Sequence, residues 1–406
     1  MQTDCGIKRQ LWVMFVMFVL SVPAYADDRA SFEQTYDKYQ HYIDINETEL
    51  ALESMRDAYR YGARLFGKSS INTVNLAIEY ARLLNGKNDF KAARKVLKGK
   101  DRILESRYGA TGVELVPFLI QMGRAAKDPD TALGYLQRAA SLSQGYEDDL
   151  MEAKKNFEIL FILLARGGAA LTEPYVERAF EIYDARLQAS DVRLGLMAYH
   201  KARWTTSRGE LDQSLGYLRR SLIAFEGQQP MGDLERGARV QLVQTLEKLG
   251  RSGEATQHLR AIGAATPWST AAGPVYQSQA NTFARLRESL GEGEVKLSFT
   301  VDENGFVVDP RITKSSSGLL SDAMLEMVRG FRYLPRFVDN HAVATPDVEY
   351  TESFANVVAD AKGPNRFSRP GERGFMNSGM LDVSDCGSDT NNSPNCDRIG
   401  GGKSGK

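Results

Sequence analysis

The sequence predicts an α-solenoid of paired helices followed by a small α+β domain. Apolar residues recur at three- and four-residue spacing from about Ser31 to Ala265, as expected for helices that bury one face. A loop-and-helix unit repeats within that region, and alternation typical of strands begins only near Gly293. The chain has 406 residues, enough for two or three domains.

The repeat is a short loop followed by a small residue that opens a helix. It occurs in four segments: Asp89–Ala92, Pro129–Ala132, Leu211–Ser214 and Ser252–Ala255. Ala92 and Ala132 lie 40 residues apart, and Ser214 and Ala255 lie 41 apart. The interval of 82 residues between Ala132 and Ser214 leaves room for one more unit, in which we expect a helix over Tyr175–Leu187.

Stacking explains such a repeat, because a helical hairpin cannot bury its apolar face alone and small residues let neighbouring helices approach. The region from Glu47 to Ala265 resembles the tetratricopeptide family, with a longer period and longer helices. The resemblance implies a concave groove that binds a protein partner. An irregular all-α domain without a true repeat is the alternative.

The N-terminus has the pattern of a secretory signal peptide. Lys8 and Arg9 precede the apolar run Leu11–Val22, and Ala24–Ala26 offers a small-x-small cleavage site. The apolar run is shorter than the roughly 20 residues of a spanning helix. We therefore expect export to the periplasm, with an uncleaved inner-membrane anchor as the alternative.

The tail after Val358 is polar and glycine-rich, and its composition predicts disorder. Cys386 and Cys396 lie in it, ten residues apart. In an oxidising compartment they can close a small disulfide. The alternative, which the sequence supports equally, is that both cysteines remain free thiols.

Composition argues against several function classes. The net charge of −1 gives no support for nucleic-acid binding. No two of the four histidines, His41, His200, His258 and His341, are close in sequence, so we expect no metal site. Nucleophile-elbow, zinc-protease and phosphate-loop motifs are missing from the folded region, so we expect neither an enzyme nor a cofactor.

The C-terminal region predicts a hairpin, a helix and a further strand. Val295–Val301 alternates apolar and polar residues, Asp302–Gly305 forms a turn, and a return strand runs from Phe306 toward Thr313. One face of the expected helix is marked by Leu319, Ala323, Met324, Met327 and Val328. Asp339–Asn340 predicts a second turn, and Asp347–Phe354 a last strand.

This array, from Gly293 to Phe354, resembles the C-terminal domain of TonB. The signature residues of the resemblance are Arg332, Tyr333 and Pro335 after the helix, with Gly305 closing the first turn. Tyr333 and Pro335 fit a purely structural role equally well.

The resemblance implies that the last strand is an edge that pairs with an extended peptide, the TonB box of an outer-membrane transporter. The expected peptide-binding residues are Val348, Glu349, Tyr350, Thr351, Glu352, Ser353 and Phe354. The implied partners are a TonB-dependent transporter or another envelope protein, and components of the TonB system.

The chain departs from an energy transducer of that family. Its N-terminal segment looks cleavable, and its 13 prolines are scattered rather than gathered in a long spacer. We therefore expect a non-catalytic periplasmic adaptor. The alternatives are a membrane-anchored transducer and an envelope scaffold that forms homodimers through its β domain.

The expected domain boundaries follow from these patterns. They are a signal peptide at 1–26, a helical segment at 27–46, helical repeats at 47–265, a linker at 266–292, the TonB-like domain at 293–358 and a tail at 359–406.

Overall fold

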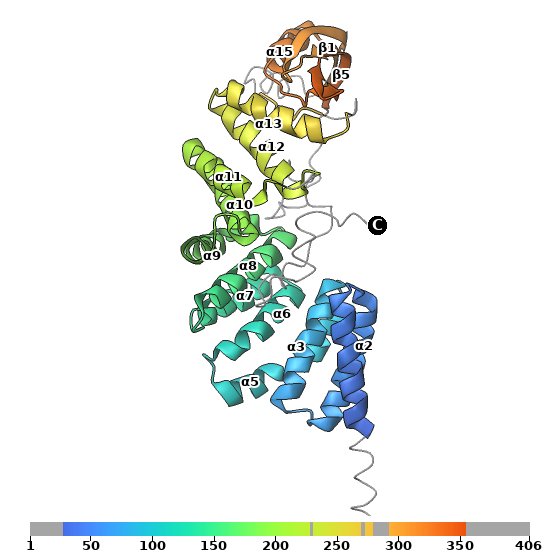
Figure 1. The fold of residues 1–406 in the computed structure, drawn as a ribbon, viewed down its shortest axis with the longest axis vertical. Coiled ribbons are helices and arrows are strands. Elements are labelled where there is room, and N and C mark those ends of the chain that lie inside the picture. Colours follow the sequence, from blue (N-terminus) through green and yellow to red (C-terminus); the bar gives the residue numbers. More distant parts are fainter. Residues whose placement is uncertain (1–26, 228–229, 269–272, 279–291, 355–406) are drawn as a thin grey trace, which may run out of the picture. The chain divides into compact units, whose positions relative to one another are not determined.

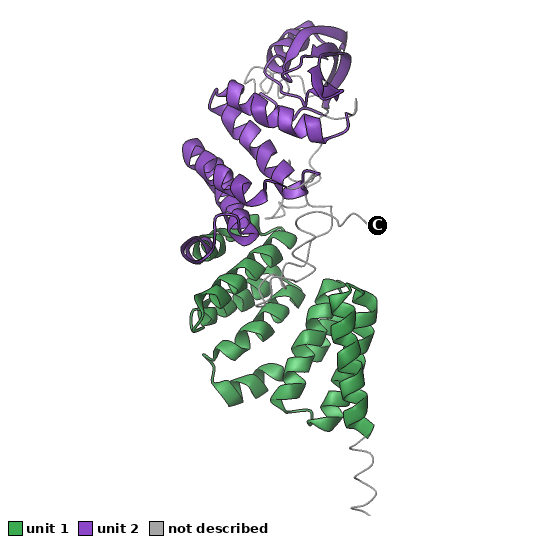
Figure 2. Cartoon of the chain, in the orientation of Figure 1, with its two compact units in different colours: residues 1–179, 382–396 green, residues 180–381, 397–406 purple. Residues whose placement is uncertain are grey.

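The computed structural model describes residues 27–227, 230–268, 273–278 and 292–354. The predicted signal segment, the tail and both of its cysteines lie outside these residues. The chain forms two compact units, with the boundary between residues 179 and 180 (Figure 2).

Among the described residues, the first unit is helical, and the second contains helices and all the strands (Figure 1). Residues 27–44 are helical. The helices that follow are α2 Thr48–Leu65, α3 Ile71–Gly86, α4 Phe90–Leu97, α5 Lys100–Tyr108, α6 Val116–Ala125, α7 Pro129–Ser143, α8 Asp149–Ala165, α9 Glu173–Arg186, α10 Val192–Ser207, α11 Leu211–Phe225, α12 Asp233–Lys248 and α13 Ser252–Ala265, with 3₁₀ turns at Val113–Leu115 and Ala169–Leu171.

Short polar side chains begin many of these helices. The side chains of Ser70, Asp89, Asp128, Asp148 and Asp191 each accept a hydrogen bond from a backbone N–H of the first turn. These bonds satisfy amides that have no partner inside the helix. The sequence thereby sets where these five helices start.

The predicted repeat is confirmed, with one correction. The small residue that opens each second helix is buried together with a leucine four residues later, and all eight are at most 1% exposed. The pairs are Ala93 and Leu97, Ala132 and Leu136, Ser214 and Leu218, and Ala255 and Leu259. We expected Ala92 in the first repeat, but Ala92 is only half-buried because α4 turns Ala93 toward its neighbours. The interval between Ala132 and Ser214 contains the additional helix that was expected over Tyr175–Leu187. This helix is α9.

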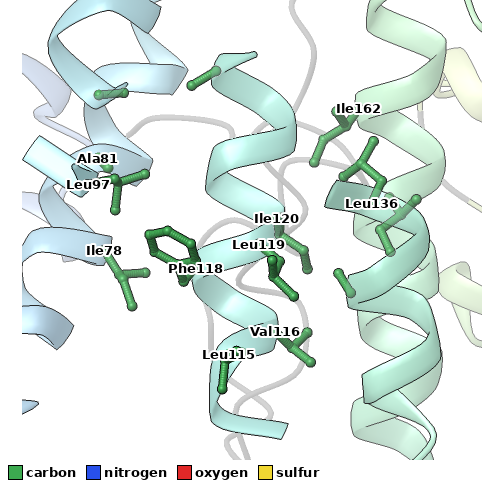
Figure 3. Close-up of a cluster of buried hydrophobic side chains, with 14 of the residues drawn as sticks. Ile78, Ala81, Leu97, Leu115, Val116, Phe118, Leu119, Ile120, Leu136 and Ile162 are labelled. Carbon is green, nitrogen blue, oxygen red and sulfur yellow. The ribbon is translucent and has the colours of Figure 1, made fainter. Parts of the chain in front are cut away.

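Consecutive hairpins share one core in the first unit. Leu97, Phe118, Ile120, Leu136 and Ile162 come from the four helices α4, α6, α7 and α8 and converge in one buried cluster (Figure 3). A hairpin removed from its neighbours would expose this apolar surface, so the helices depend on stacking for stability. Among the described residues, no helix has both the length and the apolar character needed to cross a membrane.

Because α10 buries a histidine, we expect the second unit to lose stability in acid. Burial, and then the charge of Arg203, lower the pKa of His200 to about 3. The unfolded side chain titrates near pH 6.5, so below that pH the unfolded state binds the additional proton and stability falls. Between pH 7.5 and pH 5 we expect a loss of about 2 kcal/mol from this residue.

The measurement is the urea unfolding free energy of the mature chain and of His200→Gln at both pH values. The variant should lack about 2 kcal/mol of the pH dependence shown by the wild type. Equal dependence in the two proteins would show that His200 is not the acid-sensitive group.

The β domain is a three-stranded antiparallel sheet with one helix on its core face. β1 Gly293–Val301 lies between β2 Val307–Ser315 and β5 Thr345–Phe354. α15 Gly318–Val328 packs against β1 and β2. The inward residues of β1, predicted from the alternation, are at most 2% exposed: Val295, Leu297, Phe299 and Val301.

Two details of this domain differ from expectation. In α15, Leu320 is fully buried while Leu319 is 66% exposed, so the predicted face was wrong by one residue at its start. The last strand begins at Thr345, two residues earlier than expected, and includes Pro346. Periodicity could not separate Leu319 from Leu320, since both lie at helical spacing from later apolar residues.

The second predicted turn is confirmed. β3 Arg336–Val338 and β4 His341–Val343 form a separate two-stranded hairpin. Asp339 and Asn340 connect them with φ of 48° and 63°. Positive φ at both central residues is typical of a two-residue turn that matches the twist of its strands.

Candidate functional site

The outer side of β5 is an open sheet edge in the part of the chain that the structure describes. β5 pairs with β1 on its inner side only. The register runs without interruption from Val348 opposite Phe299 to Phe354 opposite Gly293. The seven residues predicted to bind a peptide therefore form one regular stretch of strand, which can accept an additional strand.

The backbone groups that face outward can be assigned from β1. Glu294 accepts a hydrogen bond from Ser316 N at 3.0 Å and donates one to Ser316 Oγ at 3.0 Å, so its backbone faces the β2 side. Alternate residues of an antiparallel strand face opposite sides, so Val295, Leu297 and Phe299 face β5.

The partners of these three residues in the register are Glu352, Tyr350 and Val348. The N–H and C=O groups of Glu349, Thr351 and Ser353 then point to the open edge.

The opposite edge of the sheet, β2, is interrupted. The β1–β2 register shifts between Lys296 and Leu297 and again between Ser298 and Thr300. Near the second shift lie Asp309, with φ of 50°, and Pro310, which has no N–H to donate. Bulges and proline protect an edge against pairing. The two edges are therefore unequal, and β5 is the one suited to an incoming strand.

β5 carries its own irregularity at its start. Val301 pairs with Thr345 while Phe299 pairs with Val348, so β5 has an additional residue there. Asp347 has φ of 55° at this bulge, beside Pro346. The bulge ends regular pairing and defines Val348 as the first residue of the open stretch.

The core-facing side chains of β5 are held in place. Val348 is buried, and the Tyr350 ring meets the Phe331 ring edge-on, with centroids 5.3 Å apart at 84°. The Tyr350 hydroxyl donates to Glu352 Oε2 at 2.7 Å and accepts from Gln277 Nε2 at 3.3 Å. Burial and then the Glu352 carboxylate raise the pKa of Tyr350, so the phenol stays neutral.

The other face of β5 is polar and exposed. Glu349 forms a 2.9 Å ion pair with Lys296 on β1, and Thr351 and Ser353 are exposed. Phe354 pairs through its backbone with Gly293. A peptide added to this edge would meet an aromatic and aliphatic face on one side and a polar face on the other.

The predicted signature residues contact the core and α13. Gly305 has φ of 86°, and its carbonyl accepts the Tyr333 N–H at 2.9 Å. The Tyr333 ring is 2% exposed and lies 5.5 Å from the Phe299 ring. Pro335 lies against α13, where a Cβ on Gly263 would come within 2.6 Å of the Pro335 carbonyl.

Arg332 joins the β domain to the last helical hairpin. Its side chain is 1% exposed and forms an ion pair with Glu247 of α12, whose side chain is 8% exposed. Its Nη2 donates to Thr256 Oγ1 of α13 at 2.7 Å and to the Asn304 carbonyl at 3.1 Å. The guanidinium lies 3.7 Å from the centre of the Phe306 ring.

The sequence did not point to Glu247 or Thr256, because polar residues on a helix are normally solvated. A signal was present in the segment expected to be a linker. Trp268 packs against the β-domain core, and Tyr276 forms a bridge with Arg332. Large aromatic residues in a loop indicate that the loop is packed.

The described residues contain no group of three or more histidine, cysteine, aspartate or glutamate side chains arranged to hold a metal ion.

Comparison with known proteins gives one domain match. Residues 284–350 match the family model described as Gram-negative bacterial TonB protein C-terminal. No curated protein sequence matches the chain.

Solved structures also match the chain, at low identity. BtubC (BKLC) from P. vanneervenii is 13% identical, with 68% of this chain and 98% of that chain covered and a TM-score of 0.39. A putative kinesin light chain of Podosopora anserina with nearly identical TPR-like repeats is 11% identical, with coverage of 59% and 95% and a TM-score of 0.33. At these scores neither neighbour bears on function.

Proposed function

We propose that this protein, whose residues 284–350 match the TonB C-terminal family, is a non-catalytic adaptor of the bacterial envelope. In this proposal it is exported to the periplasm, and its β5 edge binds the extended TonB box of an outer-membrane transporter. The helical repeats bind a second protein. The observation that carries the proposal is the uninterrupted edge from Val348 to Phe354, beside a β2 edge that is bulged and bears a proline.

Strand addition accounts for binding without a pocket. The outward N–H and C=O groups of β5 supply hydrogen bonds that do not depend on the peptide sequence. Side chains fix the register, since those of Val348 and Tyr350 lie on the core face and those of Glu349 and Thr351 on the polar face. A TonB-box peptide would thus be recognised by its extended shape and by the alternation of its side chains between the two faces of the sheet.

Thr351→Pro is expected to weaken peptide binding about tenfold or more. Proline removes one outward N–H and adds a ring at the edge, while the inward bonds of Tyr350 and Glu352 to β1 remain. Thr351→Val is the matched control, because it keeps the N–H and a β-branched side chain. Fluorescence anisotropy with labelled TonB-box peptides of the host's transporters measures both variants.

The control should bind like the wild type. Equal affinity of Thr351→Pro and wild type would contradict binding at this edge, and no binding by the wild type would remove the transporter link. Affinity capture from envelope extract with both proteins sorts partners, because proteins still captured by Thr351→Pro engage the helical region or another surface.

The open edge also favours a second function, a scaffold in which β5 pairs with β5 of another copy. Sedimentation at several concentrations tests it, since association should be lost in Thr351→Pro. N-terminal sequencing of the exported protein separates the adaptor from a membrane-anchored transducer. A start at Asp27 excludes a retained anchor.

A further inference from the structure

We propose that Arg332 is a positioning residue for the β5 edge, and that α12 and α13 are a structural part of the peptide-binding unit. This inference rests on the proposed function where it concerns peptide binding. Its structural part, the support of β5 by the helical hairpin, is independent of any ligand. The juxtaposition that carries it is a continuous series of contacts from Glu247 through Arg332 and residues 275–278 to Tyr350.

The first step is the burial of the Arg332 side chain between three elements. A guanidinium excluded from water needs a charged partner and further hydrogen bonds. Glu247 supplies the charge, and Thr256 and the Asn304 carbonyl accept two further bonds, while the guanidinium Nε has no partner among the described residues. Glu247 is itself held, because Ser252 donates to its other carboxylate oxygen at 2.6 Å. The ion pair therefore depends on α12, α13 and the β1–β2 turn at once.

The second step is the backbone of Arg332. Its N–H donates to the Tyr276 carbonyl at 2.9 Å, and its carbonyl accepts the Val275 N–H at 2.7 Å. On the other side of residues 275–278, Gln244 of α12 donates to the Val275 carbonyl at 3.1 Å. The segment is thus fixed between α12 and Arg332.

The third step reaches the edge strand. Gln277, next to Tyr276, donates to the Tyr350 hydroxyl at 3.3 Å, and Phe331, next to Arg332, packs edge-on against the Tyr350 ring. Tyr350 faces inward near the middle of the open stretch. Its neighbours in the chain, Glu349 and Thr351, present the outward backbone groups. Loss of the Arg332–Glu247 pair would release both supports of Tyr350.

The α12–α13 hairpin also packs directly against the β domain. α13 approaches the Pro335 backbone at Gly263, and Arg260 lies 6.0 Å from the centre of the Phe337 ring. Trp268, after α13, packs against the same core as β1 and α15. The hairpin and the sheet therefore share apolar surface as well as the ion pair.

The test compares hydrogen exchange in the mature full-length chain and in Glu247→Gln. The variant removes the charge and keeps the side-chain size. We expect amides of residues 275–278 and the inward amides of β5 to exchange at least tenfold faster, while those of α15 are unchanged. Glu294→Gln is the control, because it removes an exposed ion pair with Lys314 in the same domain. It should change neither segment.

Peptide affinity is the second readout, and it should fall in Glu247→Gln and stay constant in Glu294→Gln. Unchanged exchange in residues 275–278 and β5 of Glu247→Gln overturns the inference. If that variant also loses protection in α15, Gln244→Ala decides instead, since it removes the side-chain bond to Val275 and otherwise only a bond from Gln241 within α12.

Gln244→Ala should raise exchange in residues 275–278 and β5, and no change there overturns the inference. If the wild type binds no peptide, the proposed function fails while the exchange comparison still tests the role of Arg332.

Discussion

Gly305→Ala should destabilise the β domain by about 4 kcal/mol, the sum of a strained backbone and a backbone clash. Gly305 has φ of 86°, which side-chain-bearing residues rarely adopt. A Cβ there would lie 2.2 Å from the Tyr333 carbonyl oxygen. The neighbour is backbone, and it belongs to the segment that places Arg332 and Tyr333, so it cannot move without disturbing the core.

Gly250→Ala is the matched control for this prediction. Gly250 has φ of 71° in the turn between α12 and α13, and a Cβ there meets nothing within 4 Å. Its cost should be about 1 kcal/mol, from backbone strain alone. Opening free energies from hydrogen exchange of β1 measure both variants. Similar values for the two would mean that the Tyr333 carbonyl does not constrain Gly305.

The sequence could predict the elements of the β domain because each has a local cause. Alternation predicted β1, the Asp302–Gly305 turn predicted the hairpin, and Asp339–Asn340 predicted the second turn. The same local patterns could not settle which of Leu319 and Leu320 is buried, or whether Ala92 or Ala93 faces the next helix. Those choices depend on the neighbouring element, which periodicity along one helix does not contain.

The candidate site could likewise be predicted from the sequence only in part. Family likeness could identify β5 as the candidate edge and Arg332 as a signature residue. The role of Arg332 could not be predicted, because Glu247 lies 85 residues away in sequence and looks like any solvated helical glutamate. Long-range pairs of this kind have no local signal. Trp268 and Tyr276 in the expected linker were the available indication that the helices and the sheet pack together.

A double-mutant cycle on Arg332 and Glu247 should show strong coupling. Arg332→Met or Glu247→Leu alone leaves one buried charge without its partner, which typically costs about 3–5 kcal/mol. Replacing both removes the uncompensated charge and leaves apolar side chains between α12, α13 and the β1–β2 turn. The double variant should therefore be destabilised by less than either single variant, by about 2 kcal/mol or less.

Urea unfolding followed by tryptophan fluorescence, to which Trp268 on the β-domain core contributes, measures the four proteins. Additive costs in the double variant would mean that the two side chains act independently and that their pairing does not hold the domain to the hairpin.

Coupling between the two substitutions has a consequence for peptide binding. If the double variant keeps the hairpin docked, residues 275–278 still support Tyr350, and its peptide affinity should exceed that of both single variants. Stability and binding would then depend on the same contact, because the hairpin that the ion pair holds is also the support of the β5 edge.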